Sequence, residues 1–233
     1  MVDPFNRALC MTADAEGYGR RSDPEKAVVQ EQLSEVLGRA AEQAGLARDT
    51  WQRQPKGDEE LAVIPSAEFE PAVVDPFIAA LDRELSVVNL GVPPSRRLRL
   101  RVALHHGVVH PAALGFGGQG VVHVCRLVNG AAVKQALTAA PDSNLAVVLS
   151  PEVFDHVVRQ GHTSLSPKDF REIDVTNKEI TAKGWLRVPG SDVHALDLGQ
   201  PRAAKPAPAG RVAHIEFHDV VNAEHATFGF REG

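Results

Sequence analysis

The sequence has few cysteines, no long hydrophobic run and no excess of positive charge. Its 233 residues include two cysteines, Cys10 and Cys125, both in apolar stretches. We therefore expect buried free thiols in a reducing cytoplasm. Residues 1–6 lack the basic start and apolar core of a signal peptide, and no stretch approaches the ~20 apolar residues of a membrane span. The net charge of −5 argues against a general nucleic-acid-binding protein.

What the chain does contain is enough apolar material for one sizeable domain. Hydrophobic residues make up 43% of the sequence, which suffices for a full core. We expect this domain to occupy residues 1–199. Residues 200–210, QPRAAKPAPAG, predict an extended Pro/Ala linker. Residues 211–233 are apolar enough to dock, on their own domain or on a protein partner, but too short to fold alone.

Hydrophobic spacing predicts alternating strands and helices over the first 190 residues. Strands are expected at 8–11, 51–53, 61–64, 98–106, 145–149, 173–175 and 185–188. Helices are expected at 23–44, 77–88, 121–137 and 151–159, with a glycine-rich loop at 115–120. This order, βαββαβ with an αβ extension, indicates an α+β fold with a ferredoxin-like split βαβ arrangement.

Two acidic residues follow or flank predicted buried strands. Asp14 follows the apolar run 8–11, after Thr12 and Ala13, and precedes Gly17 and Gly19; Asp58 lies beside a predicted hairpin tip. If the two strands pair, the carboxylates converge and repel, and the usual remedy is a divalent cation. Taken singly, Asp14 is also compatible with capping a turn, and Asp58 with an ordinary hairpin position.

Four short motifs give these residues a family context. Residues 12–19 (TADAEGYG) match F-A-D-I-x-G-F-T, and 56–58 (KGD) match a Gly-Asp hairpin. Residues 101–107 (RVALHHG) match R-x-G-I-H-x-G, and 118–127 (GQGVVHVCRL) match G-D-x-V-N-x-A-x-R-L. Over residues 5–190 the chain therefore resembles class III nucleotidyl cyclase catalytic domains, the adenylate/guanylate cyclase family, and most of all the stand-alone cyclase-like domains of actinobacteria.

The resemblance implies an internal phosphoryl transfer, in which the 3′-hydroxyl of a nucleoside triphosphate attacks the α-phosphate and expels pyrophosphate. Asp14 and Asp58 would hold two Mg²⁺ or Mn²⁺ ions. Arg126 would stabilise charge on the α-phosphate, and Lys178 would bind the outer phosphates. The resemblance also implies a head-to-tail homodimer with shared sites. The backbone that would cradle the triphosphate belongs to Ala15, Glu16, Gly17, Tyr18 and Gly19.

The chain also departs from the family pattern at several positions. Val122 stands where a transition-state asparagine is expected, and the neighbouring His123 points about 100° away on a helix. The two base-reading positions fall on Gln54 and Gln119; since Gln both donates and accepts, the base stays open and includes a pyrimidine. Glu59 follows Asp58 where a small residue is usual.

Other patterns have simpler interpretations. Neighbouring strand residues point to opposite faces, so a zinc site shared by His105 and His106 is not expected. The arginines at 97, 99 and 101 predict a solvated or dimer-facing strand edge. Two functions remain open: an active nucleotidyl cyclase, or a catalytically degenerate cyclase fold that binds nucleotide and regulates a partner.

Overall fold

The structure, a computed structural model, describes residues 6–66, 68–113, 115–177 and 180–199. The expected linker, the C-terminal segment and Lys178 lie outside these described residues. Within them, no helix combines the length and the apolar character needed to cross a bilayer.

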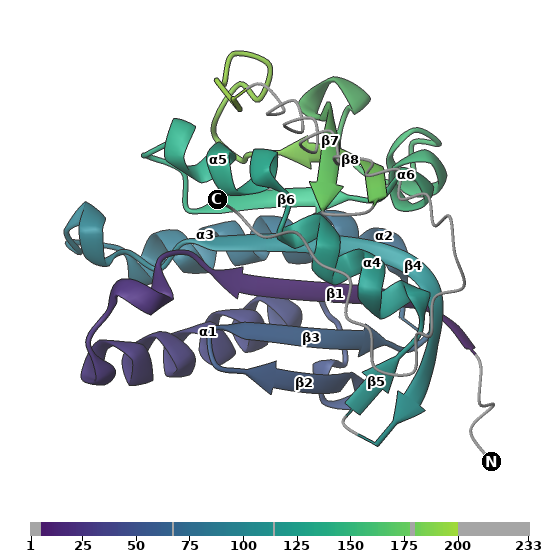
Figure 1. Cartoon of the computed structure of the whole chain (residues 1–233), viewed down its shortest axis with the longest axis horizontal. Coiled ribbons are helices and arrows are strands. Elements are labelled where there is room, and N and C mark those ends of the chain that lie inside the picture. The colour runs from purple at the N-terminus through teal and green to yellow at the C-terminus, as the bar shows by residue number, and fades with distance from the viewer. Residues whose placement is uncertain (1–5, 67, 114, 178–179, 200–233) are drawn as a thin grey trace, which may run out of the picture. The chain divides into compact units, whose positions relative to one another are not determined.

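One mixed sheet organises the described part of the chain (Figure 1). Its strand order is β2-β3-β1-β4-β6-β8-β7, with β5 paired to β4. All pairs are antiparallel except β4 with β6. This is the expected α+β fold. The strands are β1 Asn6–Ala15, β2 Gln52–Lys56, β3 Glu59–Ile64, β4 Leu100–Ala112, β5 Gly115–Gly117, β6 Leu145–Leu149, β7 Arg171–Asn177 and β8 Ile180–Arg187.

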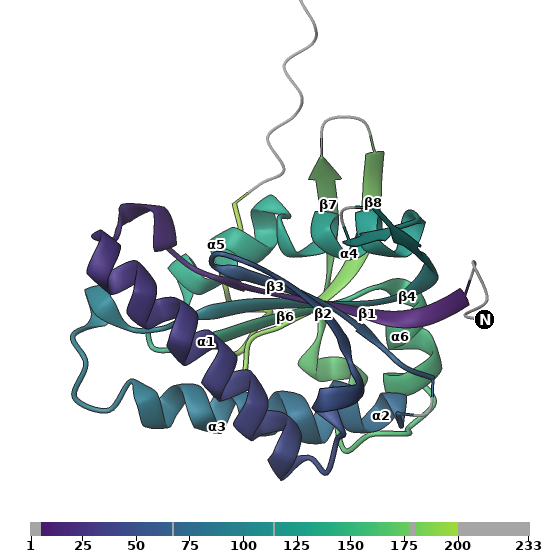
Figure 2. The ribbon, with the colours of Figure 1, turned by 90° about the horizontal axis from the view of Figure 1, so that it is seen from below.

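Helices cover both faces of this sheet. Figure 2 shows α1 and α3 on one face, and α4 and α5 on the other. Helix α1 begins with a capping box in which Ser22 and Glu25 satisfy each other's backbone N–H groups. The helices are α1 Asp23–Gln43, α2 Glu70–Ala72, α3 Ile78–Val88, α4 Gln119–Val128, α5 Ala131–Ala139 and α6 Pro151–Val153, with π-helical turns at Val73–Phe77 and Phe154–Val158.

The strand alternation divides the core into two layers. In β1, Leu9, Met11 and Ala13 pack with α1 and α3, whereas Cys10 packs in the second cluster with residues of α4 and α5. Because side chains alternate along a strand, Asp14 belongs to the face that α4 covers.

Two local expectations were wrong. The single helix expected over 121–137 is two helices, because the chain leaves helical geometry at Gly130 (φ −56°, ψ 139°). A Cβ at Gly130 would lie 3.1 Å from a Val175 side-chain carbon, so this close approach favours glycine there. The expected loop at 115–120 begins as strand β5, which pairs with the end of β4 in a hairpin.

Glycine also sets the distance between α4 and the sheet. A Cβ on Gly107 would lie 2.7 Å from the Cα of Gly120, well inside van der Waals contact. The backbone of α4 therefore rests directly on β4, which fixes the position of the side chains that α4 presents.

Both thiols are free, as expected. Burial raises the pKa of Cys10 to about 12 and, together with the nearby Glu59 carboxylate, the pKa of Cys125 to about 11. Both side chains therefore stay protonated at neutral pH.

Candidate active site

The structure brings Asp14 and Asp58 together at one end of the sheet. Strands β1 and β3 pair so that Asp14 lies opposite Glu59. The backbone N–H of Ala15 donates to the carbonyl O of Asp58 at 2.9 Å. Gly57, with φ 66°, makes the tight turn that returns the chain into β3. The convergence of the two acidic positions expected from sequence is therefore present.

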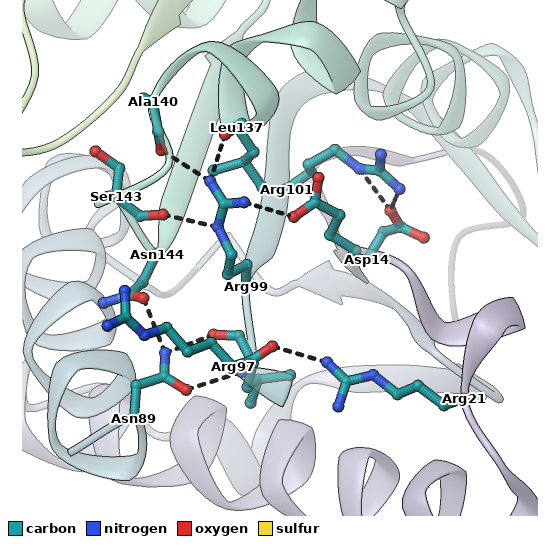
Figure 3. Close-up of polar contacts among 12 residues, drawn as sticks. Asp14, Arg21, Asn89, Arg97, Arg99, Arg101, Leu137, Ala140, Ser143 and Asn144 are labelled. Atoms are coloured by element: carbon teal, nitrogen blue, oxygen red, sulfur yellow. Dashed lines mark hydrogen bonds and ion pairs between the residues drawn. The ribbon is translucent and has the colours of Figure 1, made fainter. Parts of the chain in front are cut away.

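An arginine on the central strand β4 forms an ion pair with one of these carboxylates. Arg101 of β4 donates to Oδ2 of Asp14 through Nε, at 2.7 Å, and also through Nη2 (Figure 3). The Asp14 side chain is only 14% exposed and the Arg101 side chain only 12%. Burial nevertheless raises the pKa of Asp14 above its usual value; Arg101 opposes this shift, and Asp58 and Glu59 add to it. The site thus holds more negative charge than one arginine compensates.

Some backbone N–H groups of the turn after β1 already donate hydrogen bonds within the chain. The N–H of Ala15 is bonded to Asp58, and the N–H of Glu16 donates to the carbonyl O of Arg99 at 2.8 Å. Gly17 is left-handed (φ 74°), and Tyr18–Arg20 form a short 3-10 turn. Of the five amides expected to cradle a triphosphate, two are therefore engaged within the chain. For those of Gly17, Tyr18 and Gly19, no acceptor lies among the residues that the structure describes.

The arginines at 97, 99 and 101 do not form the solvated or dimer-facing strand edge that we expected. Strand β4 is central, between β1 and β6. Arg99, just before β4, pairs with Glu16, and Arg101, within β4, pairs with Asp14. The carbonyl O of Arg97 accepts a hydrogen bond from Arg21 at 2.7 Å. The sequence alternation was recognised correctly, but the strand's place in the sheet was not.

Helix α4 presents the remaining candidates. Val122 and Arg126 stand four residues apart on one helix face, and Val122 is 38% exposed. Within the described residues, Arg126 forms no ion pair or hydrogen bond with any side chain, Asp14 and Asp58 included. His123 packs its ring against His105, with centroids 5.0 Å apart. His123 therefore faces the sheet and does not take the place of the expected asparagine.

Of the two glutamines expected to read the base, Gln54 lies against β5, and Gln119 follows β5 in the chain. Gln54 of β2 lies against Gly115, since a Cβ there would come within 2.3 Å of Gln54 Oε1. Gln119 is exposed at the start of α4, two residues beyond the end of β5.

Comparison of the whole fold with solved structures gives consistent matches. The chain is similar to an adenylate/guanylate cyclase/hydrolase from Silicibacter pomeroyi (TM-score 0.55, 20% identity, covering 80% of this chain and 99% of that one). It is also similar to the guanylyl cyclase Cya2 (TM-score 0.53, 14% identity, 85% and 100% covered). A third match is the adenylyl cyclase CyaB of P. aeruginosa (TM-score 0.52, 13% identity, 80% and 96% covered).

The fold is that of a class III nucleotidyl cyclase catalytic domain. No family model matches the sequence, and no curated protein matches it either. The cyclase fold is therefore recognised through its tertiary structure and through short motifs, at low sequence identity.

Glu59 is an addition to this cyclase-like site. Its Oε1 accepts a hydrogen bond from Thr12 Oγ1 at 3.0 Å and from Cys125 Sγ at 3.8 Å. Thr12 is fully buried, so Glu59 is held toward α4 beside Asp14. The sequence showed that Glu59 was unusual, but not what would hold it.

A buried histidine lies beneath α4 of the cyclase-like domain. His105 is 7% exposed, and its Nδ1 is 3.6 Å from Oε2 of Glu152. Burial lowers the pKa of His105 to about 4, which outweighs the opposing effect of Glu152; His123, His106 and Arg7 lower it further. Folding therefore favours the neutral imidazole.

This shift predicts a loss of stability in acid. The folded pKa is below the unfolded value of ~6.5, so the contribution is complete above pH 6.5 and is lost as the pH falls toward 4. The full loss is about 3 kcal/mol. We expect urea unfolding of the wild type and of His105→Gln to diverge by this amount between pH 7 and pH 4. A constant difference between the two proteins over that range would contradict the prediction.

Proposed function

We propose that this protein is a nucleotidyl cyclase that converts a nucleoside triphosphate to a 3′,5′-cyclic nucleotide and pyrophosphate at a homodimer interface. The observation that supports it most is the convergence of Asp14 and Asp58 beside a glycine turn with uncommitted amides, within a cyclase fold. Phosphoryl transfer needs mainly positioning and neutralisation of phosphate charge, and this site offers groups for both.

The residues fit divalent cations. Asp14 and Asp58 supply the hard oxygen ligands that Mg²⁺ and Mn²⁺ prefer. Burial, together with the neighbouring Asp58 and Glu59 carboxylates, raises the pKa of Asp14 although Arg101 opposes the shift. Among the described residues no group of three or more ligating side chains gathers, so backbone carbonyls, water and substrate phosphates would complete the coordination, as is usual for Mg²⁺. Bound there, two ions would lower the pKa of the 3′-hydroxyl and neutralise phosphate charge.

Backbone amides and side chains of the protein would position the nucleotide. The amides of Gly17, Tyr18 and Gly19 would bind phosphate oxygens, with Arg101 nearby as a second source of positive charge. Arg126, which has no partner among the described residues of its own chain, would reach the α-phosphate held by the other subunit. Lys178 is proposed for the outer phosphates. Gln54 and Gln119 would contact the base beside β5, with either a purine or a pyrimidine allowed.

The second candidate is a degenerate cyclase fold that binds nucleotide and regulates a partner. It is favoured by Val122, an exposed apolar side chain one helical turn before Arg126, where the resembled family has an asparagine. Valine offers no hydrogen bond to orient a ribose.

A test of the first proposal removes the acidic pair. We expect Asp14→Ala and Asp58→Ala each to lower Mn²⁺-dependent turnover of the four nucleoside triphosphates more than about 100-fold, since even loss of a residue that only hydrogen-bonds to a metal ligand costs ~10–100-fold. Products are identified by mass spectrometry. Asp155→Ala, which removes an exposed ion pair with Arg159, is the matched control. Unchanged turnover in both site variants would refute the metal assignment.

Assembly of the site from two chains predicts complementation. Asp14→Ala and Arg126→Ala would each be inactive alone. In a 1:1 mixture half of the dimers carry one intact site, so we expect roughly a quarter of wild-type activity. Sedimentation equilibrium checks the dimer itself. Full activity in a strictly monomeric protein would exclude a shared site.

A further inference from the structure

Arg99 holds the turn that follows β1 through two separate contacts with Glu16. The backbone N–H of Glu16 donates to the carbonyl O of Arg99 at 2.8 Å, and Nη1 of Arg99 donates to Oε2 of Glu16 at 3.0 Å. The Arg99 and Glu16 side chains are 14% and 19% exposed. Because both contacts join the same two residues, they fix the position and the direction of Glu16 immediately before left-handed Gly17.

The opposite side of the guanidinium is fixed just as firmly. Nε of Arg99 donates to the carbonyl O of Ser143 at 2.9 Å, and Nη2 donates to that of Ala140 at 2.8 Å and also to that of Leu137 (Figure 3). These carbonyls belong to the end of α5 and the connection to β6, where the last turn of a helix lacks intrahelical donors. Every nitrogen of the rigid fork is therefore used, and Arg99 itself is not available to a ligand.

We propose that Arg99 is a positioning residue that acts through Glu16 to preset the amides of Gly17, Tyr18 and Gly19 for a phosphate group. It anchors the turn to the end of α5 and to the connection between α5 and β6. This inference rests on the proposed function, because it requires the turn to bind the phosphates of a nucleotide. It goes beyond that function by assigning a role to a residue that touches neither nucleotide nor metal.

Electrostatics and positioning make opposite predictions for Glu16. Removing a carboxylate beside a triphosphate should strengthen binding if charge alone matters, because a like charge is lost. Removing the Glu16 carboxylate, which accepts a hydrogen bond from Arg99, should weaken nucleotide binding if positioning matters, because small displacements of binding groups are costly. Glu16→Ala therefore discriminates between the two, and it leaves the three carbonyl contacts of Arg99 in place.

The experiment uses the full chain and two measurements. We expect Glu16→Ala to weaken binding of a non-hydrolysable nucleoside triphosphate with Mn²⁺ about tenfold, the order of one charge-assisted hydrogen bond. In the nucleotide-free protein, we expect amide hydrogen exchange at Glu16, Arg20 and Arg21, whose N–H groups donate to the carbonyl oxygens of Arg99, Gly17 and Tyr18, to accelerate by a similar factor. Glu16→Gln, which still accepts a hydrogen bond from Arg99, should fall between the wild type and Glu16→Ala. Glu172→Ala, which removes an exposed pair with Lys183, should match the wild type in both measurements.

Three results would overturn the proposal. Unchanged exchange at Glu16, Arg20 and Arg21 in Glu16→Ala would show that Arg99 does not hold the turn. Faster exchange with equal or tighter nucleotide binding would show that Arg99 stabilises the turn but does not position it for phosphate binding. Absence of nucleotide binding by the wild type would refute the proposed function, and with it the role of Arg99 in phosphate binding. Because this result comes from the wild type alone, it is distinguishable from the other two.

Discussion

Replacing Val122 with asparagine is expected to raise the turnover of this protein by about 10²–10³-fold, the usual effect of one positioned hydrogen-bond donor on a transition state. Val122 is 38% exposed on α4, and Arg126 lies one turn further along the same helix face. In the resembled family an asparagine here orients the ribose. Since the acidic pair and Arg126 are untouched, nucleotide affinity should change little. Single-turnover kinetics with Mn²⁺, together with equilibrium binding, separates the two quantities.

The comparison needs a control that changes size without adding a donor. Val122→Ala is this control, and we expect it to give no gain in turnover. A wild-type turnover already within the usual ~1–10³ s⁻¹ would mean that another group orients the ribose. No turnover in either form, with binding intact, would favour the regulatory protein over the enzyme. No nucleotide binding with metal present would exclude both functions.

Loss of Arg48 is expected to cost about 3–5 kcal/mol of unfolding free energy, because it leaves a buried carboxylate unpaired. Arg48 and Glu60 face each other in two parallel contacts, Nη1 to Oε1 at 2.8 Å and Nη2 to Oε2 at 2.9 Å. Their side chains are 8% and 7% exposed, and the guanidinium also lies 5.5 Å from the centre of the Trp51 ring. Urea unfolding of Arg48→Met measures the loss.

A double substitution distinguishes a buried charge from simple loss of packing. Arg48→Met combined with Glu60→Met should recover most of the lost stability, since apolar replacement of a whole buried pair is often close to neutral. Lys183→Met, which breaks exposed pairs with Glu172 and Asp174, should leave the unfolding free energy nearly unchanged. A loss in the double variant as large as in Arg48→Met would contradict this account. Glu60 lies two residues from Asp58, so the pair also supports the strand next to the candidate site.

The local pattern of the chain was readable because short-range physics sets it. Apolar spacing predicted most of the strands and helices, and the α+β class followed from their order. The apolar run ending at Asp14 and the Gly57 turn before Asp58 predicted that two carboxylates converge, which a single antiparallel pairing of β1 with β3 accomplishes. Where a glycine interrupts an apolar helix, as at Gly130, sequence periodicity alone did not show the break.

The tertiary structure decided which groups compensate one another, because those partners are far apart in the sequence. The alternation of Arg99 and Arg101 predicts only that they point the same way along the predicted strand; it does not reveal that β4, which contains Arg101, lies in the middle of the sheet, beside β1. That placement, a long-range property, turns an expected solvated stripe into the partners of Glu16 and Asp14. The sequence by itself thus determined most of the elements, their order and the convergence of the two acidic positions. Only the packed sheet determined the ion pairs around them, since the free energy of a buried charge depends on neighbours that the chain brings together by folding.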